Sequence, residues 1–265
     1  MLFHWSFDPV FLTLGPLSIH WYGVLFVSAF LAGQVILGRI FLAEGLPREY
    51  VDRMLLQVLI GTVLGARLVH CLAYDLGFYM NNPLEILKIW KGGLASHGGA
   101  VGLLLALWWY ARSVEPHIPF LWLLDRVSTP AALGAVFVRV ANFLNSEIVG
   151  LPTESGFGVV FDAVDSLPRH PVQLYEAVAC LLIFGILLAL YRRDGDRTPQ
   201  GLLTGLFLIL VFGSRIALEF FKVPQAAYEA GQSLSVGQYL SGTFVLVGIW
   251  LVILSIRTRH VRNSN

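Results

Sequence analysis

The sequence carries little charge for its length. Asp, Glu, Lys and Arg account for 13% of its 265 residues, whereas soluble domains usually contain about 25%. Hydrophobic residues account for 56%. A protein core cannot absorb that much apolar surface, but a lipid bilayer can. The composition therefore excludes an ordinary soluble domain and predicts an integral membrane protein.

Cysteine and metal-binding patterns are also scarce. The two cysteines, Cys71 and Cys180, lie in apolar segments and cannot form the disulfide framework of a small secreted protein. The sequence has no zinc-type spacing, no His-x-x-x-His pair in a span and no glycine-rich loop after a strand. We therefore expect no metal and no cofactor. A net charge of +1 without a basic tract gives no reason to expect a nucleic acid partner.

The first 16 residues lack Lys and Arg, whereas a secretory signal begins with positive charge. We therefore expect no cleavage of this segment as a signal. Its apolar side chains, from Leu2 to Phe11, favour a segment that lies in the membrane interface.

Seven stretches are long and apolar enough to cross a membrane, which takes about 20 residues. They are residues 19–41, 54–73, 94–110, 120–143, 172–190, 202–221 and 236–256. The sequence thus predicts an all-α integral membrane protein, with residues 1–265 forming a single membrane domain of about seven transmembrane helices. Residues 146–170, rich in Gly, Pro and Asp, are expected to form a small cap between the fourth and fifth helices.

Glycine pairs four residues apart indicate close contacts between helices. Such pairs occur at Gly61 and Gly65, at Gly98 and Gly102, and at Gly201 and Gly205, the small-xxx-small spacing that lets two helix backbones approach. We find no convincing internal repeat. This weakens a transporter interpretation, because many transporter folds are built from repeats.

The basic residues of the loops predict the orientation. If the N-terminus lies outside the cytoplasm, ten Lys and Arg residues fall on the cytoplasmic side and four on the opposite side. Cytoplasmic loops carry the excess of positive charge. We therefore expect a periplasmic N-terminus, a cytoplasmic C-terminus and a periplasmic cap.

With this orientation, polar residues within several spans gather at the outer face. They come late in the second, fourth and sixth helices and early in the first, third and fifth: Arg67, Arg139, Arg215, Tyr22, His97, Gln173 and Glu176. Ionisable groups in a span are costly and usually paired or functional. Any one of them could instead extend to the interface or cap a helix, but that explanation fits the whole set poorly.

Helical spacing refines the pattern. Arg215 and Glu219 are four residues apart, so they share a face and can pair. Arg139 and Asn142 also share a face. Arginine offers phosphate a planar fork of donors and keeps its charge when buried. Two arginines with amides and carboxylates at one membrane face therefore suit an anionic lipid headgroup, whereas a transporter would place such groups near the midplane.

Several motifs carry a resemblance to a known family. The most specific is R-x-x-N-F-x-N-x-E-x-x-G, which begins at Arg139 and includes Asn142, Asn145, Glu147 and Gly150. Others are His20–Gly23, Gly92–Gly99, Arg169–Glu176, and Arg215 with Glu219 and the run 234–238. In these motifs the chain resembles bacterial prolipoprotein diacylglyceryl transferase, from residue 20 to residue 238. It departs from the family pattern at Val138, where Gly is usual, and at Val211, where Tyr is common.

The resemblance implies a reaction and its partners. Such an enzyme transfers diacylglyceryl from phosphatidylglycerol to the lipobox cysteine of preprolipoprotein signal peptides and releases glycerol phosphate. This implies a multi-pass protein of the bacterial inner membrane. The thiol must lose its proton to attack, and His97 is the candidate base because imidazole titrates near neutral pH. Arg139 and Arg215 would bind the phosphate and stabilise the departing oxygen.

The other expected site residues would contact substrate or hold the two arginines. Glu219 would orient Arg215, Asn142 and Asn145 would donate to glycerol or phosphate oxygens, and Gly98 and Gly99 would let lipid or peptide backbone approach. Substrate contacts are also expected for Tyr22, Glu147, Gly150, Gln173 and Glu176. Alternatives are a transporter or flippase that uses the same cluster, and a lipid-binding paralogue without covalent chemistry.

Overall fold

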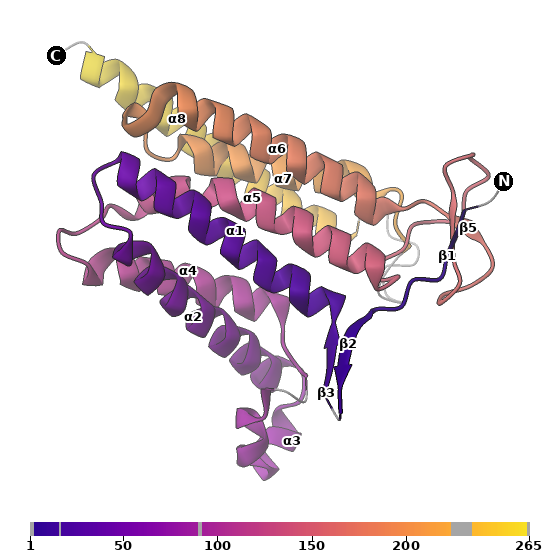
Figure 1. Ribbon diagram of the computed structural model, residues 1–265. Helices are drawn as coiled ribbons and strands as arrows, with labels where there is room; N and C mark the ends of the chain where they lie inside the picture. The colour runs from indigo at the N-terminus through magenta and orange to yellow at the C-terminus, as the bar shows by residue number, and fades with distance from the viewer. Residues whose placement is uncertain (1–2, 16, 90–91, 224–234, 264–265) are drawn as a thin grey trace. The chain divides into compact units, whose positions relative to one another are not determined.

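All seven predicted spans are α-helices. The computed structural model describes residues 3–15, 17–89, 92–223 and 235–263 (Figure 1). The predicted spans correspond to α1 (Trp21–Ala43), α2 (Glu49–Ala73), α4 (Ser96–Ser113), α5 (Phe120–Leu144), α6 (Val172–Asp194), α7 (Leu202–Glu219) and α8 (Val236–Asn263). The chain divides into two compact units, Met1–Ile36 with Asp125–Asn265 and Leu37–Leu124, and each is described separately.

The helices are those of a membrane protein. Six of them, α1, α2, α5, α6, α7 and α8, are long and apolar enough to cross a bilayer. Many of their large apolar side chains, such as Leu64, Leu182 and Leu246, are exposed, as expected of surfaces that contact lipid. The chain is therefore a multi-pass membrane protein. The remaining predicted span is α4, which is helical but is not among the six candidate spans of the described residues.

In the first unit, a buried carboxylate fixes the level at which α5 and α7 begin. Asp125, in the first turns of α5, accepts hydrogen bonds from the amides of Gly201 (2.7 Å) and Thr204 (2.8 Å) at the start of α7. A carboxylate there satisfies amides that have no partner within the helix. Asp125 thus anchors the start of α7 to the start of α5. From this shared level, Arg139 lies about 21 Å along α5 and Arg215 about 17 Å along α7, at 1.5 Å per residue.

The cap contains a sheet that includes the N-terminus. Strand β1 (Phe3–Trp5) pairs in parallel with β4 (Val159–Phe161), which pairs antiparallel with β5 (Pro168–Arg169). The ring of Trp5 lies 4.5 Å from that of Phe143 at the end of α5. Figure 1 shows β1 and β5 together, at the end of this unit opposite to the C-terminus. The sheet thus fastens the N-terminal segment to the end of α5.

The N-terminal prediction was therefore incomplete. The segment expected to lie in the interface forms β1 and then a hairpin of β2 (Val10–Leu14) and β3 (Leu17–His20). Phe11, Leu12 and Leu14 remain exposed on the hairpin, which keeps an apolar surface next to the start of α1. Backbone pairing satisfies the amides that an unstructured interfacial segment would leave to water or headgroups.

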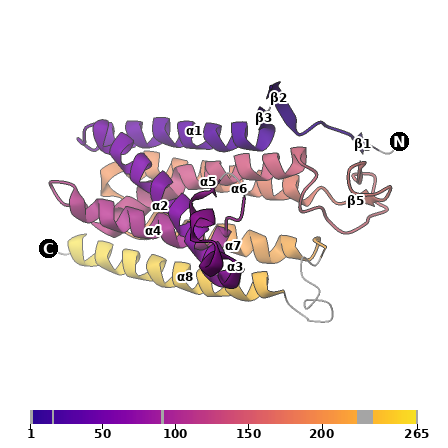
Figure 2. The same cartoon turned by 90° about the horizontal axis from the view of Figure 1, so that it is seen from below.

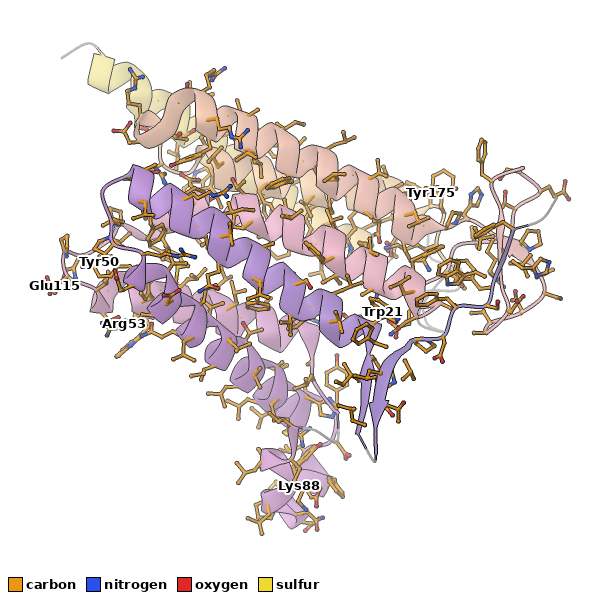
Figure 3. All side chains as sticks on the ribbon, in the orientation of Figure 1. Trp21, Tyr50, Arg53, Lys88, Glu115 and Tyr175 are labelled. Carbon is orange, nitrogen blue, oxygen red and sulfur yellow. The ribbon has the colours of Figure 1, made fainter. Side chains whose placement is uncertain are left out.

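Glycine contacts join α2 and α4 in the second unit, as their spacing predicted. A Cβ on Gly61 would lie 2.7 Å from Cβ of Ala106 and 2.8 Å from the carbonyl oxygen of Gly102, and a Cβ on Gly65 would clash with the carbonyl oxygen of Gly98. Along the chain, α2 and α4 are connected by α3 (Leu76–Asn81) and the short 3₁₀ helix η1 (Pro83–Leu87). In Figure 3, Tyr50, Arg53 and Glu115 lie at one end of this unit and Lys88 at the other.

The third predicted glycine pair also makes a helix contact. Gly205 of α7 packs against Gly248 of α8, where a Cβ on Gly205 would lie 2.8 Å from the Gly248 carbonyl oxygen. Figure 2 shows α7 and α8 running side by side. Close backbone approach of this kind supplies the van der Waals contact that holds helices together in lipid.

The α2–α4 contact predicts that Gly65→Ala destabilises the protein. The added methyl group has no room against α4, and overpacking of this kind costs about 1–3 kcal/mol. The thermal midpoint in detergent should fall by several degrees, as measured by size-exclusion chromatography after heating. Gly185→Ala on α6, where a Cβ meets nothing within 4 Å, is the matched control and should not lower it. Equal midpoints for the two variants would contradict the contact.

The cap predicts a pH dependence at Asp165. The Arg169 guanidinium, which donates to this carboxylate, lowers the pKa of Asp165 from its ordinary value of 3.8. Because the folded pKa is the lower one, the pair stabilises the cap fully above about pH 4, and its contribution disappears as pH falls through the lowered folded pKa. Hydrogen exchange of residues 150–169 should be slower than in Asp165→Asn at pH 6. The difference between the two rates should shrink as pH falls through the lowered folded pKa of Asp165 if the pair is responsible.

Candidate active site

A buried carboxylate joins three segments at the ends of α5, α6 and α7 that lie toward the cap. Glu176 of α6 is 5% exposed. Its Oε2 lies 3.0 Å from Nε of Arg139 on α5, and its Oε1 lies 2.7 Å from Nζ of Lys222, which follows α7. A buried carboxylate is stable only when cations and donors compensate it. The ion pairs confirm that Arg139 and Glu176 lie at the same depth, as their positions along the helices predicted.

The motif that begins at Arg139 folds back on itself through a tight turn. Ser146 and Ile148 have φ values of 55° and 56°, a conformation that side chains other than glycine rarely adopt. The turn directs Glu147 back to the helix, where its carboxylate accepts hydrogen bonds from the amides of Asn142 (3.0 Å) and Asn145 (3.2 Å). The motif residues are thus in mutual contact.

Gln173 and Asn142 are buried parts of the same network. The side-chain amide of Gln173 donates to the backbone carbonyl of Glu147 at 2.6 Å, which fixes the turn to the start of α6. The Oδ1 atom of Asn142 lies 3.5 Å from Nη1 of Arg139. Asn142 therefore connects the Arg139 guanidinium to the Glu147 carboxylate.

The predicted pair of Arg215 and Glu219 does not form among the described residues. Instead, the Glu219 carboxylate lies 3.2 Å from Nζ of Lys222 and accepts a hydrogen bond of 3.2 Å from the Ser235 hydroxyl before α8. Spacing along α7 allows either partner, because both positions lie within one helical turn of Glu219. Glu219 therefore does not orient Arg215 by an ion pair, and this expectation was wrong.

Arg215 is left without a protein anion within the described part of the chain. Its Nε atom is buried and has no hydrogen-bond partner there. Its Nη2 atom lies 3.5 Å from the position that a Cβ of Gly237 would occupy, so the guanidinium sits against the start of α8. A buried arginine donor without a partner is costly, and an anionic ligand would satisfy it.

Tyr22 belongs to the same group. It lies half-buried at the start of α1, and its phenol interacts electrostatically with Glu147 and Arg139. Figure 3 shows the neighbouring Trp21 and the α6 residue Tyr175 at the same end of this unit. The structure therefore brings Tyr22, as predicted from its depth, to the Arg139 motif.

Gly150 has a packing role in the structure. A Cβ there would lie 2.5 Å from the carbonyl oxygen of His170 and 2.7 Å from Cγ2 of Val172. Its backbone also forms a bridge with Lys222. The absence of a side chain at Gly150 thus lets the cap approach the residues that follow α7.

The predicted base lies in the second unit. His97 is exposed at the start of α4, and its imidazole has no hydrogen-bond partner among the described residues. The backbone of Ala95 is fixed just before it by a 2.9 Å hydrogen bond to the carbonyl of Ala66.

Gly98 and Gly99 face α2. A Cβ on Gly98 would lie 2.5 Å from Cβ of Val69, and one on Gly99 would lie 3.4 Å from Cγ2 of Thr62. Both glycines are buried. The expectation that they leave room for lipid or peptide is therefore corrected, because helix packing fills that space.

Arg67 holds the loop before His97. Its guanidinium donates to the backbone carbonyls of Glu85, Ile86, Gly92 and Gly93 at 2.5–3.0 Å. This buried arginine was expected among the outer-face polar residues. Its donors are occupied by the loop, so it does not serve as an anion site.

Comparison with known proteins identifies the family. The model of the family described as prolipoprotein diacylglyceryl transferase matches residues 9–254. The chain belongs to this family. The chain is therefore an enzyme, a transferase of lipoprotein biogenesis, and the resemblance inferred from the motifs is confirmed.

Relatives in three bacteria carry the name phosphatidylglycerol–prolipoprotein diacylglyceryl transferase. The protein from Tolumonas auensis is 52% identical over 98% of this chain and 99% of its own length. That from Chloroherpeton thalassium is 43% identical over 98% and 97%. That from Porphyromonas gingivalis is 39% identical over 96% and 94%. The similarity thus extends over nearly the full length of each protein.

Sequence reasoning missed one residue of this diacylglyceryl transferase site. Lys222 was not among the expected site residues, yet it contacts both Glu176 and Glu219. Its spacing of three residues from Glu219 was an available signal. Among the described residues, no three His, Cys, Asp or Glu side chains gather as metal ligands would.

Proposed function

We propose that the chain transfers diacylglyceryl from phosphatidylglycerol to the lipobox cysteine of preprolipoproteins. The cysteine sulfur forms a thioether bond to the terminal glyceryl carbon, and the bond from that carbon to the phosphate oxygen breaks. The thiol proton passes to a base, and glycerol phosphate leaves with the bonding electrons. Family membership and the names of the relatives support both substrates.

The observation that carries the residue assignment is the unpartnered guanidinium of Arg215. Its buried Nε has no acceptor among the described residues, while the carboxylates of this end of the unit each lie within 3.2 Å of another cation or amide: Glu147 of Asn142, Glu176 of Arg139 and Glu219 of Lys222. A lipid phosphate supplies the missing acceptor. As the carbon–oxygen bond breaks, negative charge grows on that phosphate, and Arg215 stabilises it.

Arg139, on α5, is the second arginine proposed to bind the lipid headgroup. Glu176 holds its Nε atom at 3.0 Å, which fixes the plane of the guanidinium and leaves Nη atoms for the phosphate or glycerol oxygens. The same motif includes Asn142, Asn145 and Glu147, and Tyr22 lies near it. We assign the amides and the phenol to the polar glycerol end of the lipid, because donors of this kind match its hydroxyls.

His97 serves as the base that accepts the thiol proton. The ring is exposed and unpartnered in the described part of the chain, so it is free to accept a proton. The loop that precedes it is fixed by Arg67, which gives the imidazole a defined position. A thiolate is the reactive nucleophile, and an ordinary thiol has a pKa of about 8.5.

We place the protein in the bacterial inner membrane with the cap of residues 146–170 in the periplasm. Ten basic loop residues against four support this orientation. In the first unit, Arg193 lies at the C-terminal end of α6, whereas Arg139 and Glu176 lie toward the cap. The proposed site then faces the compartment that receives preprolipoproteins after export.

Arg215→Lys tests the phosphate assignment. Lysine keeps the charge but loses the fork of donors, so thioether formation should fall about 10²–10³-fold, as for loss of one transition-state donor. The assay is mass spectrometry of a lipobox peptide incubated with proteoliposomes that contain phosphatidylglycerol. Arg193→Gln, at the opposite end of the first unit, is the matched control and should retain full activity.

The same assay separates the alternatives. Wild-type activity retained in Arg215→Lys would refute the phosphate assignment. Lipid or solute flux without a thioether product would favour a transporter or flippase, and phosphatidylglycerol binding without product would favour a non-catalytic paralogue.

His97→Gln tests the base. Glutamine keeps a polar side chain but cannot take up a proton near neutral pH. The rate should fall about 10²–10⁴-fold, the usual contribution of a general base. The decline of the wild-type rate toward acid pH, where imidazole is protonated, should disappear. A variant that keeps the acidic limb of the pH–rate profile would exclude His97 as the base.

A further inference from the structure

Lys222 is an ammonium buried between two carboxylates. Its side chain is 7% exposed, and Nζ lies 2.7 Å from Glu176 and 3.2 Å from Glu219. Lysine is seldom buried unless it is paired. The same carboxylate of Glu176 also holds Arg139. Lys222 therefore links two carboxylates of the site. One is that of Glu176, which orients Arg139, and the other is that of Glu219, which lies beside Arg215.

Glu219 and Arg215 are neighbours that do not pair. Oε1 of Glu219 lies 3.2 Å, and Nη2 of Arg215 lies 3.5 Å, from the point where a Cβ of Gly237 would stand. The residues are also four apart on α7, a spacing that favours ion pairs. A carboxylate and a guanidinium this close would normally combine. Their separation requires a competing partner for Glu219, and Lys222 is that partner.

We infer that Lys222 is a positioning residue that holds Glu219 away from Arg215, so that Arg215 remains available for an anionic phosphate. This inference rests on the proposed function, because it needs a phosphate substrate. Without Lys222, the free Glu219 carboxylate would bind Arg215 and compete with the lipid. The competition would weaken binding of phosphatidylglycerol more than it would slow the chemical step.

The side chain of Lys222 can be tested apart from its backbone. Its amide donates to the carbonyl of Glu219 at 3.0 Å, and its backbone bridges Gly150. A substitution leaves these bonds in place, so the fold of this segment should survive. The ammonium itself is occupied by two carboxylates, which makes it a poor direct ligand for phosphate.

The experiment compares Lys222→Gln, Lys222→Arg and the double variant Lys222→Gln/Glu219→Gln. Initial rates of thioether formation are measured in nanodiscs over a range of phosphatidylglycerol mole fractions, which gives KM and kcat. The single glutamine variant should raise KM about tenfold or more, with a smaller change in kcat. The arginine variant should stay within about threefold of wild type, because it keeps the charge.

The double variant decides the mechanism. Removing the Glu219 charge removes the competitor for Arg215, so KM should return to within about threefold of wild type. Lys88→Gln, in the second unit, is the matched control, since Lys88 also pairs with a glutamate three residues away, Glu85. It should leave KM unchanged.

Several outcomes would overturn the inference. KM unchanged in Lys222→Gln would show that Glu219 does not compete. A double variant as impaired as the single one would show that Lys222 acts as a phosphate ligand or only in folding. If Lys222→Gln does not accumulate in the membrane, the other two variants decide. A tenfold rise of KM in either Lys222→Arg or the double variant would then overturn the inference. Wild-type protein without thioether product would instead refute the proposed function.

Discussion

The buried carboxylate of Glu176 organises the functional end of the first unit. It forms ion pairs with Arg139 through one oxygen and with Lys222 through the other, so α5, α6 and the segment after α7 meet at one anion. A carboxylate removed from water is costly unless cations compensate it. This constraint fixes the depth and orientation of Arg139. It also binds Lys222. The second contact of Lys222, with Glu219, keeps Glu219 from pairing with Arg215, and Arg215 is left without an ion-pair partner among the described residues.

A second carboxylate acts at the other end of the same helices. Asp125 receives two amides from the start of α7 and thereby aligns α5 with α7 in register. Because helices rise by a constant amount per residue, this alignment places Arg139 and Arg215 at similar depths about a dozen residues later. Asp125 is thus remote from the proposed chemistry yet sets its geometry. Asp125 thus positions the helices at one end of the unit, and Glu176 positions them at the other.

Much of this arrangement could be predicted from the sequence, for identifiable reasons. A span needs a minimum length of apolar chain, so the seven long helices of the described residues were predicted, whereas the six-residue α3 was not. Depth along a helix follows from residue number, so Arg139, Glu176 and Tyr22 were placed together correctly. Glycine spacing likewise predicted the α2–α4 and α7–α8 contacts, because only glycine permits the observed approach.

The errors arose where spacing left a choice of partner. Glu219 has cations at four residues before it and three residues after it, and only the position of Glu176 favours Lys222. Gly98 was correctly recognised as a site of close approach, but the sequence does not say whether lipid or helix α2 approaches. Strands β1 and β4 are three residues each and lie far apart in the chain, so no local pattern indicates their pairing.

The turn after α5 shows how the site tolerates an unfavourable backbone. Left-handed conformations at Ser146 and Ile148 cost about 1–3 kcal/mol each. Between them, Glu147 makes four hydrogen bonds, two from side-chain amides to its carboxylate, one through its own amide to Asn142 and one from Gln173 to its carbonyl. Hydrogen bonds to charged groups contribute about 1.5–3 kcal/mol and neutral ones about 0.5–1.5, which is enough to offset the strain. Asn142 and Gln173 are therefore buried because they hold this turn, and the turn in its place fixes the polar groups beside Arg139. A substitution at either position would change the fold of the turn and the proposed headgroup contacts together.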